Sequence, residues 1–306
     1  MTQHDTKPEF RWPDDYVRLK GGLLVRPDCV EGFRELGWVS LDHLMISKDV
    51  HVVREVDSRD NCTVTIPTAG GPVDAYLKRH RIRSFRRWYI ESRRHRSARS
   101  PGMSEAGAVQ WCQQAGIPTM SIIAAGEKRL AKGWWSDSLF MSEAMTGHLP
   151  ANEHWFPAAR RFDPPDGFAS DAETRRRVLR AVASTARRFH EANLFHYDFY
   201  LEHFFVDSTT NVARLIDLQR VERHTKGPLR WRALNKDLAQ FLSSCQRYQL
   251  SPDEFEFWKR CYLNGHENVT ELRSLDRMKF SAATGRLHVR RLRKWRRNLA
   301  PRKRAA

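Results

Sequence analysis

The chain has 306 residues, of which 41% are hydrophobic, and it includes 16 Phe and 10 Trp. This length accommodates two lobes, and so many apolar side chains exclude a chain that is disordered throughout. Lys and Arg number 53 against 36 Asp and Glu, a formal net charge of +17 that indicates a polyanionic partner such as nucleic acid, anionic lipid or a phosphorylated glycan.

Two segments carry the excess of positive charge. Arg79–Arg99 contains nine Arg and one acid, and Gly285–Ala306 contains ten Lys or Arg and no acid. Helical spacing places four apolar residues of the second segment on one arc: Val289, Leu292, Trp295 and Leu299. This pattern predicts a basic amphipathic helix on an anionic membrane, or a helix packed on the protein with a solvated basic face. Nucleic acid is disfavoured, because no nucleic-acid-binding motif accompanies these segments.

Neither the N-terminal residues nor the cysteines predict export. Residues 1–11 are polar and lack the apolar core of a signal peptide, and no uncharged apolar run approaches the length of a membrane span. The five cysteines are scattered, without a CxxC pair, which is typical of reduced thiols. Together with the basic tail, these features predict a cytoplasmic protein that associates peripherally with an anionic membrane.

The first half of the chain predicts a small lobe rich in β-structure. Residues 1–45 have only a weak pattern, and we expect an N-terminal extension there. A three-stranded antiparallel start follows, at His51–Val56, Cys62–Thr68 and Pro72–Lys78. A helix is expected next, from Ser104 as its N-cap to about Ala115, and then strands at Met120–Ala125 and Ser138–Met145.

After Gly147 the pattern becomes helical. Helices are expected at Asp171–Ala192, Leu234–Tyr248 and Pro252–Leu263, with short apolar segments at Phe204–Val206 and Val212–Leu218. The fold class is therefore α+β: a small antiparallel β lobe with one helix at residues 46–146, a larger and mainly helical lobe at 147–284, and the basic tail at 285–306.

Several polar residues stand in the order that phosphoryl transfer from ATP requires. Lys78 ends a strand, Glu105 begins the next helix, and His196-Tyr197-Asp198 follows the long helix. His203 lies five residues after Asp198, and Asp217 ends an apolar run nineteen residues after Asp198. A strand lysine, a helix glutamate, a catalytic aspartate, an auxiliary ligand and a metal-binding aspartate form the protein-kinase order.

This order assigns a role to each residue. Asp198 would accept the proton of the acceptor hydroxyl, and Asp217 and His203 would hold Mg²⁺ on the phosphates of ATP. Lys78 would bind the α- and β-phosphates with Glu105 as its partner. The segment Met141–Met145 would be the hinge between the lobes, where the backbone of Glu143, Ala144 and Met145 would meet adenine.

Each residue taken alone also has an ordinary structural interpretation. Asp198 and Asp217 are compatible with solvated loop or strand-end positions, Lys78 with a surface position, and His203 with a hydrogen-bonded core histidine. The order and spacing of the whole set are much more specific than any single member.

At three segments the chain resembles the lipopolysaccharide core kinase family, which includes Kdo kinases and WaaP-type heptose kinases. The segments are H-Y-D-F-Y-L-E-H-F-F-V (His196–Val206), R-L-I-D-L-Q-R (Arg214–Arg220) and R-W-R-A-L-N-K-D-L-A (Arg230–Ala239). His203 is informative, because this family has His where ordinary protein kinases have Asn. The resemblance covers roughly Val50–Tyr262.

The resemblance implies a bilobal protein-kinase-like fold and the use of ATP and Mg²⁺. It implies transfer of the γ-phosphate to a sugar hydroxyl, of Kdo or heptose, in the lipopolysaccharide inner core at the cytoplasmic membrane face. In the family, the residue matching Asp198 is the catalytic base and the residue matching Asp217 binds metal. We interpret Asp237 as structural, holding the catalytic loop.

The chain also departs from the protein-kinase pattern. The loop Asp57–Asn61, between the first two strands, has no glycine, and no P-loop motif is present. Tyr197 replaces the Arg that senses activation-loop phosphorylation, and only nineteen residues separate Asp217 from Asp237. These features favour a constitutive glycan or small-molecule kinase. Two alternatives stay open: a kinase-like enzyme on another hydroxyl acceptor, a protein or a soluble sugar, or a pseudokinase that binds membranes.

Overall fold

The structure is a computed structural model that describes residues 15–56, 58–82, 84–86, 88–89, 100–130, 135–155, 171–207 and 209–264. The chain divides into two compact units. The sheet unit comprises the described residues up to Thr146 together with Asp217–Val221, and the helical unit comprises Gly147–Ile216 and the described residues from Glu222 onward. The expected basic helix at 285–306, and residues 90–99 of the other basic segment, lie outside the described residues.

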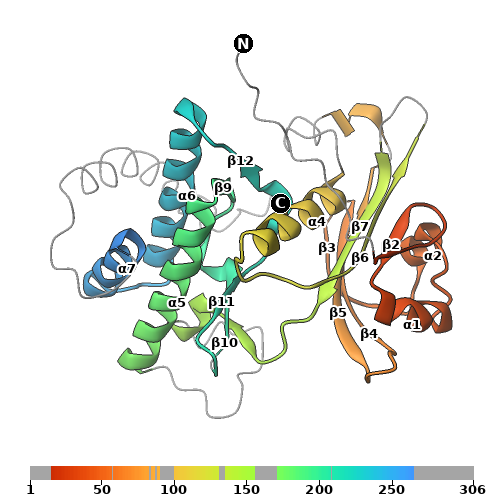
Figure 1. Ribbon diagram of the computed structural model, residues 1–306, viewed down its shortest axis with the longest axis horizontal. Coiled ribbons are helices and arrows are strands. Elements are labelled where there is room, and N and C mark those ends of the chain that lie inside the picture. Colours follow the sequence, from red (N-terminus) through yellow and green to blue (C-terminus); the bar gives the residue numbers. More distant parts are fainter. Residues whose placement is uncertain are drawn as a thin grey trace, which may run out of the picture. The chain divides into compact units, whose positions relative to one another are not determined.

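A seven-stranded sheet, in which every strand pairing is antiparallel, forms the centre of the sheet unit (Figure 1). In spatial order its strands are β1 (Val17–Arg18), β2 (Leu23–Val25), β6 (Ile122–Arg129), β7 (Trp135–Glu143), β5 (Val73–Arg81), β4 (Arg59–Ile66) and β3 (His51–Val56). The pairing of β3 with β4 and of β4 with β5 confirms the predicted antiparallel start. β6 and β7 confirm the two later strands with shifted ends.

Residues 17–46, where the sequence suggested an N-terminal extension, contribute to this same unit. They form β1, β2, a 3₁₀ turn η1 (Pro27–Cys29), α1 (Val30–Glu35) and α2 (Leu41–Ile46). Phe33, Trp38, Leu41 and Leu44 are buried in the core beside the sheet. Helices of six residues span fewer than two turns, so they leave no helical period in the sequence.

The helix α4 (Pro101–Gln114) lies on the other side of the sheet from α1 and α2 (Figure 1). The prediction of Ser104 as its N-cap is wrong: the N-cap is Ser100, whose hydroxyl accepts a hydrogen bond from the Met103 amide at 3.4 Å. Pro101 at the first helical position favours this earlier start, since its fixed φ suits the first turn and its missing N–H is not needed there. Glu105 therefore lies in the second turn of α4.

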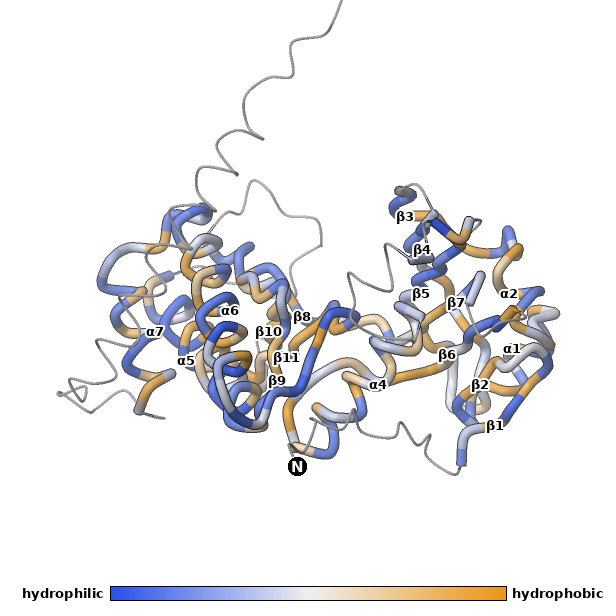
Figure 2. Tube along the Cα trace, turned by 90° about the horizontal axis from the view of Figure 1, so that it is seen from above, coloured by the Kyte–Doolittle hydropathy of each residue, from blue (hydrophilic) through white to orange (hydrophobic). Residues whose placement is uncertain are grey.

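In its described residues, the helical unit has three long helices: α5 (Ala172–Glu191), α6 (Gly227–Arg247) and α7 (Pro252–Asn264). Two short elements precede α5, β8 (His148–Pro150) and η3 (Ala151–His154), and five lie between α5 and α6: β9 (Leu194–Phe195), η5 (Leu201–His203), β10 (Phe204–Asp207), β11 (Ala213–Leu215) and β12 (Glu222–Arg223). α5 and α7 match the predicted helices closely, whereas α6 begins seven residues earlier than predicted. Hydrophobic and hydrophilic stretches alternate along α5 and α6, as in helices that bury one face (Figure 2). Within the described ranges, no helix combines the length and apolar character of a membrane span.

Aromatic side chains make up much of the core of the helical unit. Phe199 stacks on Phe189 of α5 and contacts Phe204 and Phe241 edge-on or tilted, and Phe241 in turn stacks on Trp258 of α7 with ring centroids 4.1 Å apart. Phe199 lies in the segment between β9 and η5 and is completely buried. Phe199 therefore anchors in the core the segment 196–203, which includes η5, and we refer to this segment as the 196–203 loop.

Candidate functional site

A cluster of three charged side chains lies in the sheet unit. Lys78 Nζ on β5 is 2.7 Å from Glu105 Oε1 on α4 and 2.8 Å from Asp217 Oδ1, the residue before the 3₁₀ turn η6 (Leu218–Arg220). The side chains of Lys78 and Glu105 are buried, at 7% and 0% exposure, whereas that of Asp217 is 23% exposed. Within the sheet unit, one ammonium thus joins a buried carboxylate to a more exposed one.

The local structure explains why Glu105 reaches Lys78. Lys78 pairs with Phe140 of β7 and Asn61 of β4, so it lies in the middle of the sheet. α4 approaches β7 closely at Gly102, where a Cβ atom would come within 2.4 Å of the Leu139 carbonyl oxygen. A side chain at position 102 would push α4 away from the sheet and separate the Lys78–Glu105 pair.

Electrostatics keeps Lys78 charged. Burial alone would lower the pKa of Lys78, but the carboxylates of Asp217 and Glu105 reverse this effect and raise it. Burial raises the pKa of Glu105, and the charge of Lys78 opposes that rise. Because a buried ammonium between two carboxylates is stabilised in its charged form, this cluster presents a fixed positive charge beside a partly exposed carboxylate.

Asp217 has a backbone conformation that is uncommon for a residue with a side chain. Its φ of 59° and ψ of 51° lie in the left-handed region, where Asp is tolerated better than most residues. Its Oδ1 atom accepts hydrogen bonds from Lys78 and from Gln219 Nε2, the latter at 3.2 Å. The turn η6 that follows packs on α4, so the position of Asp217 depends on the same helix that carries Glu105.

The second group of candidate residues lies in the helical unit, on the 196–203 loop. His203 Nδ1 lies 2.7 Å from the carbonyl oxygen of Asp198. A carbonyl oxygen only accepts hydrogen bonds, so Nδ1 carries the hydrogen, and in the neutral ring the lone pair is on Nε2. A backbone acceptor on one ring nitrogen with the lone pair on the other is the usual arrangement of a histidine that ligates metal.

His196 ties the loop to the strand that precedes Asp217. Its Nε2 atom donates to the Ile216 carbonyl at 2.9 Å, and its Nδ1 atom accepts from the Asp198 amide at 3.3 Å. These two roles, one donor and one acceptor, describe a neutral imidazole, and the residue is completely buried. Ile216 also donates its amide to the His203 carbonyl at 3.0 Å. Ile216 is thus fixed at both backbone groups immediately before Asp217.

One face of α6 holds the backbone of the 196–203 loop. The buried carboxylate of Asp237 accepts from the His196 amide at 2.6 Å and from the Tyr197 amide at 2.8 Å. Gln240 Nε2 donates to the Tyr197 carbonyl at 2.8 Å and lies 3.3 Å from Asp198 Oδ1, and Ser244 Oγ accepts from the Leu201 amide at 2.9 Å. These contacts fit the structural role predicted for Asp237.

Sequence reasoning missed Gln240 and Ser244. Together with Asp237 they follow the spacing i, i+3, i+7, which places three polar side chains on one helix face. That spacing was visible in the sequence, but a polar stripe on a helix normally indicates a solvated face. Only the burial of these residues, at 1% for Gln240 and 0% for Ser244, shows that the stripe supports a loop.

The predicted hinge residues lie at the end of β7. The Glu143 and Ala144 amides already donate to the carbonyls of Ser121 and Asp74, at 3.0 and 2.8 Å. The Glu143 carboxylate pairs with Arg26 at 2.5 Å. Among the described residues, no backbone acceptor is found for the Met145 amide, so of the three hinge amides only this one remains for an adenine ring.

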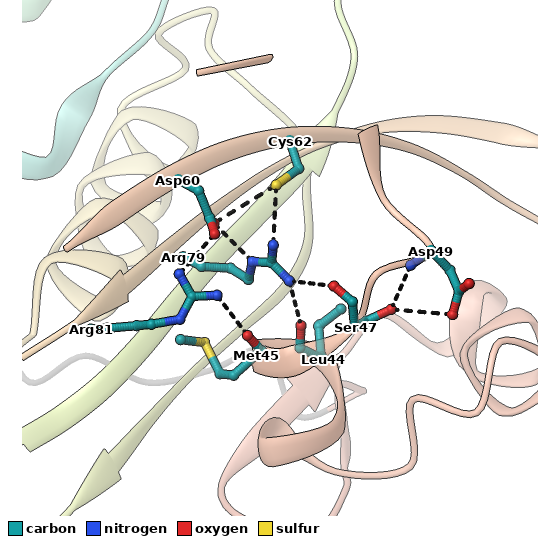
Figure 3. Close-up of polar contacts among 8 residues, drawn as sticks. All are labelled: Leu44, Met45, Ser47, Asp49, Asp60, Cys62, Arg79 and Arg81. Carbon is teal, nitrogen blue, oxygen red and sulfur yellow. Dashed lines mark hydrogen bonds and ion pairs between the residues drawn. The ribbon is translucent and has the colours of Figure 1, made fainter. Parts of the chain in front are cut away.

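The opposite face of β4 and β5 has its own charged cluster, which sequence reasoning also missed (Figure 3). Asp60 pairs with Arg79 at 2.8 Å and with Arg81 at 2.7 Å. The two guanidinium groups also donate to carbonyls at the end of α2, those of Leu44, Met45 and Ser47. Arg79 and Arg81, which the sequence counted with the basic segment 79–99, are therefore engaged inside the sheet unit.

The residues that could hold a metal are few. Across the residues that the structure describes, no group of three or more His, Cys, Asp and Glu side chains is arranged to hold a metal ion. Mg²⁺ on a nucleotide commonly takes only one or two protein carboxylates, with phosphates and water completing the shell. The partly exposed carboxylate of Asp217 has the oxygen chemistry that this ion prefers.

Comparison with solved structures defines the class of fold. A solved structure described as WaaP in complex with acyl carrier protein matches with a TM-score of 0.57 and 21% sequence identity, over 91% of this chain and 98% of that chain. The likeness shows a bilobal α+β fold of the protein-kinase-like class, as predicted.

The family follows from the sequence. The model of the lipopolysaccharide kinase (Kdo/WaaP) family matches residues 46–262, and the chain belongs to this family. Two curated relatives are named lipopolysaccharide core heptose(I) kinase WaaP. The protein from Pseudomonas aeruginosa is 28% identical over 148 residues, 43% of this chain and 48% of that protein. The protein from Escherichia coli is 28% identical over 141 residues, which are 44% of this chain and 49% of that protein. The matched segment spans about half the length of these curated relatives.

Proposed function

We propose that this protein is an ATP-dependent kinase that transfers the γ-phosphate to a sugar hydroxyl of the lipopolysaccharide inner core, Kdo or heptose. The observation that carries the proposal is the buried Lys78 ammonium held between Glu105 and Asp217. A fixed positive charge beside a partly exposed carboxylate is the arrangement that binds and neutralises the phosphates of a magnesium nucleotide.

On the nucleotide side, Lys78 binds the α- and β-phosphates, and Glu105 holds the lysine in place. Asp217 would hold Mg²⁺, and His203, whose Nε2 carries the lone pair, is the candidate auxiliary ligand; when bound, this ion would neutralise charge on the phosphates. The backbone of Glu143–Met145 receives adenine, and the Met145 amide is the donor left for the ring. Each role rests on the hydrogen-bond arrangement that the residue has within its own unit.

On the acceptor side, Asp198 orients the sugar hydroxyl and accepts its proton. The contact of Asp198 Oδ1 with Gln240 limits the rotation of the carboxylate, and the hydrogen bonds from α6 fix the backbone that carries it. Positioning of this kind supplies much of the rate in phosphoryl transfer, since the reaction needs little covalent participation by the protein.

The acceptor is a small group rather than a peptide. After Asp217 the chain forms only the turn η6 and the two-residue strand β12 before α6 begins at Gly227. That segment is too short for the long activation segment on which protein kinases bind peptide substrates. It favours the glycan acceptor over the protein acceptor.

The start of α6 has the chemistry of a surface for an anionic glycolipid. From Arg223 through Lys236, both included, the sequence has five Lys or Arg and no acid. Leu229 and Trp231 are 47% and 39% exposed there, beside the exposed Arg232. Cations attract phosphate and carboxylate groups, while an exposed Trp suits the boundary between water and lipid. We extend the proposal to peripheral association with the inner face of the cytoplasmic membrane, where such an acceptor would be met.

The test is transfer of radioactive γ-phosphate from Mg-ATP to purified inner-core lipopolysaccharide, with Asp198→Asn as the control. We expect labelled glycolipid with the unaltered protein and a loss of about 10²–10⁴-fold in the variant, the usual contribution of a general base. ATP binding should be unchanged in the variant. Label in soluble sugar or protein instead would favour another acceptor, and absence of both label and ATP binding would favour the pseudokinase.

A further inference from the structure

The hairpin formed by β3 and β4 has no glycine-rich loop, the feature with which kinase-like proteins usually bind the phosphates of ATP at the corresponding hairpin. Residues 51–66 contain no glycine, so the backbone of this hairpin cannot approach a nucleotide as a glycine-rich loop does. Val56 pairs with Arg59, so only residues 57 and 58 connect the two strands. Hydrogen-bond donors for the phosphates must therefore come from side chains.

Arg59 is a half-buried cation on the sheet face of Lys78, and Arg54 of β3, which pairs with Asn61 on the same face, is exposed. Arg59 and Asn61 lie two residues apart on β4, and Asn61 pairs directly with Lys78 on β5. Residues two apart, and residues directly paired across strands, project from the same face of a sheet. Glu105 and Asp217 contact Lys78 on this face. Asp60, which lies between Arg59 and Asn61, projects to the opposite face, where it pairs with Arg79 and Arg81.

The surroundings of Arg59 support an anion site. Its charge opposes the rise in the pKa of Glu105 and of Tyr76, which places the guanidinium within electrostatic range of the Lys78 cluster. Arg59 is half-buried, and its guanidinium makes no hydrogen bond or ion pair with the side chains and carbonyls of the described residues. Arg79 and Arg81 on the other face, by contrast, make hydrogen bonds with Asp60, Cys62 and the end of α2.

Asn61 gives a second, independent indication of a ligand. Its side chain is on the same face, opposite Lys78, and the residue is only 6% exposed. The Asn61 amide interacts with the Tyr76 hydroxyl, whereas its Oδ1 atom is buried without a hydrogen-bond partner in the described part of the chain. Buried polar atoms in native proteins nearly always have a hydrogen-bond partner. An unsatisfied atom beside a charged cluster therefore indicates a site where a bound ligand or a water molecule supplies the missing hydrogen bond.

We propose that Arg59 binds the polyphosphate of the nucleotide alongside Lys78, and that it replaces the glycine-rich loop in this protein. The planar guanidinium donates two parallel hydrogen bonds to one phosphate, which a lysine cannot do. This inference rests on the proposed function, because it requires that the protein bind ATP.

The experiment measures the binding of ATP, ADP, AMP and adenosine to the full chain by displacement of a fluorescent nucleotide. In Arg59→Gln we expect the affinity for ATP to fall about tenfold to a hundredfold, as for loss of a hydrogen bond to a charged group, and the affinity for adenosine to stay unchanged. Arg59→Lys should fall between, since it retains the charge without the planar fork. Arg18→Gln, an exposed arginine on β1 at the other edge of the sheet, is the matched control.

The outcomes separate the two proposals. If the unaltered protein binds ATP and Arg59→Gln binds it equally well, the role of Arg59 is wrong and the kinase proposal stands. If the unaltered protein binds no nucleotide, the kinase proposal fails and this inference fails with it. An equal loss of affinity for ATP and for adenosine would also overturn the inference, because adenosine has no phosphate and its binding should not depend on a phosphate-binding side chain. Should Arg59→Gln fail to fold, Arg59→Lys decides by the same comparison.

Discussion

The two units hold their candidate functional residues by different kinds of interaction. In the sheet unit the interactions are ion pairs, because Lys78 lies between Glu105 and Asp217. In the helical unit they are hydrogen bonds from side chains to backbone, in which Asp237, Gln240 and Ser244 bind the amides and carbonyls of the 196–203 loop. The difference fits the two tasks proposed, since phosphate binding needs a fixed positive charge whereas proton acceptance needs a fixed geometry. Substitutions should therefore have different consequences in the two units.

The largest effect is expected from breaking the ion pair. Lys78→Met leaves the Glu105 carboxylate buried without its partner, so we expect a loss of about 3–5 kcal/mol in the free energy of unfolding and at least a hundredfold loss of phosphate transfer. The double variant Lys78→Met/Glu105→Leu removes both charges and should recover most of the stability but none of the transfer. Urea unfolding and the transfer assay measure the two effects.

Lys48→Met, at an exposed lysine, is the control and should change neither quantity. Recovery of transfer in the double variant would contradict a role for the Lys78 charge in the reaction.

A smaller loss of stability is expected from substitution of Asp237 on α6, which should disturb the geometry of the 196–203 loop without changing the phosphate-binding charges. Asp237→Ala leaves the buried amides of His196 and Tyr197 without acceptors, which should cost about 2–4 kcal/mol of stability. Tyr197 has a φ of 63°, a conformation that the neighbouring contacts must maintain. We expect phosphate transfer to fall while ATP affinity, set by residues of the sheet unit, stays within twofold.

Equilibrium unfolding, transfer and nucleotide binding are measured on the same preparation, with the exposed Asp253→Ala as control. A parallel loss of ATP affinity in Asp237→Ala would show that the two groups are not supported separately.

The smallest effect concerns the cluster on the opposite sheet face. Burial alone would raise the pKa of Asp60, but the hydrogen bonds from Arg79 and Arg81 lower it below its usual value. A carboxyl whose pKa is lower in the folded state stabilises the fold above its unfolded pKa of about 4, and this contribution is lost as the pH falls through the folded value. Asp60→Asn should therefore cost about 1–3 kcal/mol at pH 7, and less as the pH falls below about 4.

Unfolding free energies of both proteins from pH 7 to pH 3 measure this convergence. A constant difference over the whole range would show that the charge of Asp60 is not what stabilises the pair. Phosphate transfer at pH 7 should be little changed, because the cluster lies on the face away from Lys78.

The parts of the fold that were predicted are those encoded by neighbouring residues. Alternation in β3, β4 and β5, and the helical period of α5 and α7, are local patterns that survive packing. The predicted start of α4 at Ser104 is wrong because a second serine, Ser100, lies four residues earlier, and both Pro101 and the close packing at Gly102 favour that start. Residues 17–46 gave no clear pattern, since their short elements are stabilised by the sheet core rather than by their own period.

The sequence by itself determined the types and order of the chemical groups: a strand lysine, a helix glutamate, Asp198, His203 and Asp217 at the spacing of a kinase-like chain. The tertiary structure decided which groups pair. Lys78 meets both Glu105 and Asp217, Asp237 and Gln240 turn a polar stripe into a support, and Arg59 and Arg79 project to opposite faces of one sheet. Composition counts every arginine as one positive charge, but burial and pairing set what each charge does, and both depend on residues distant in the chain.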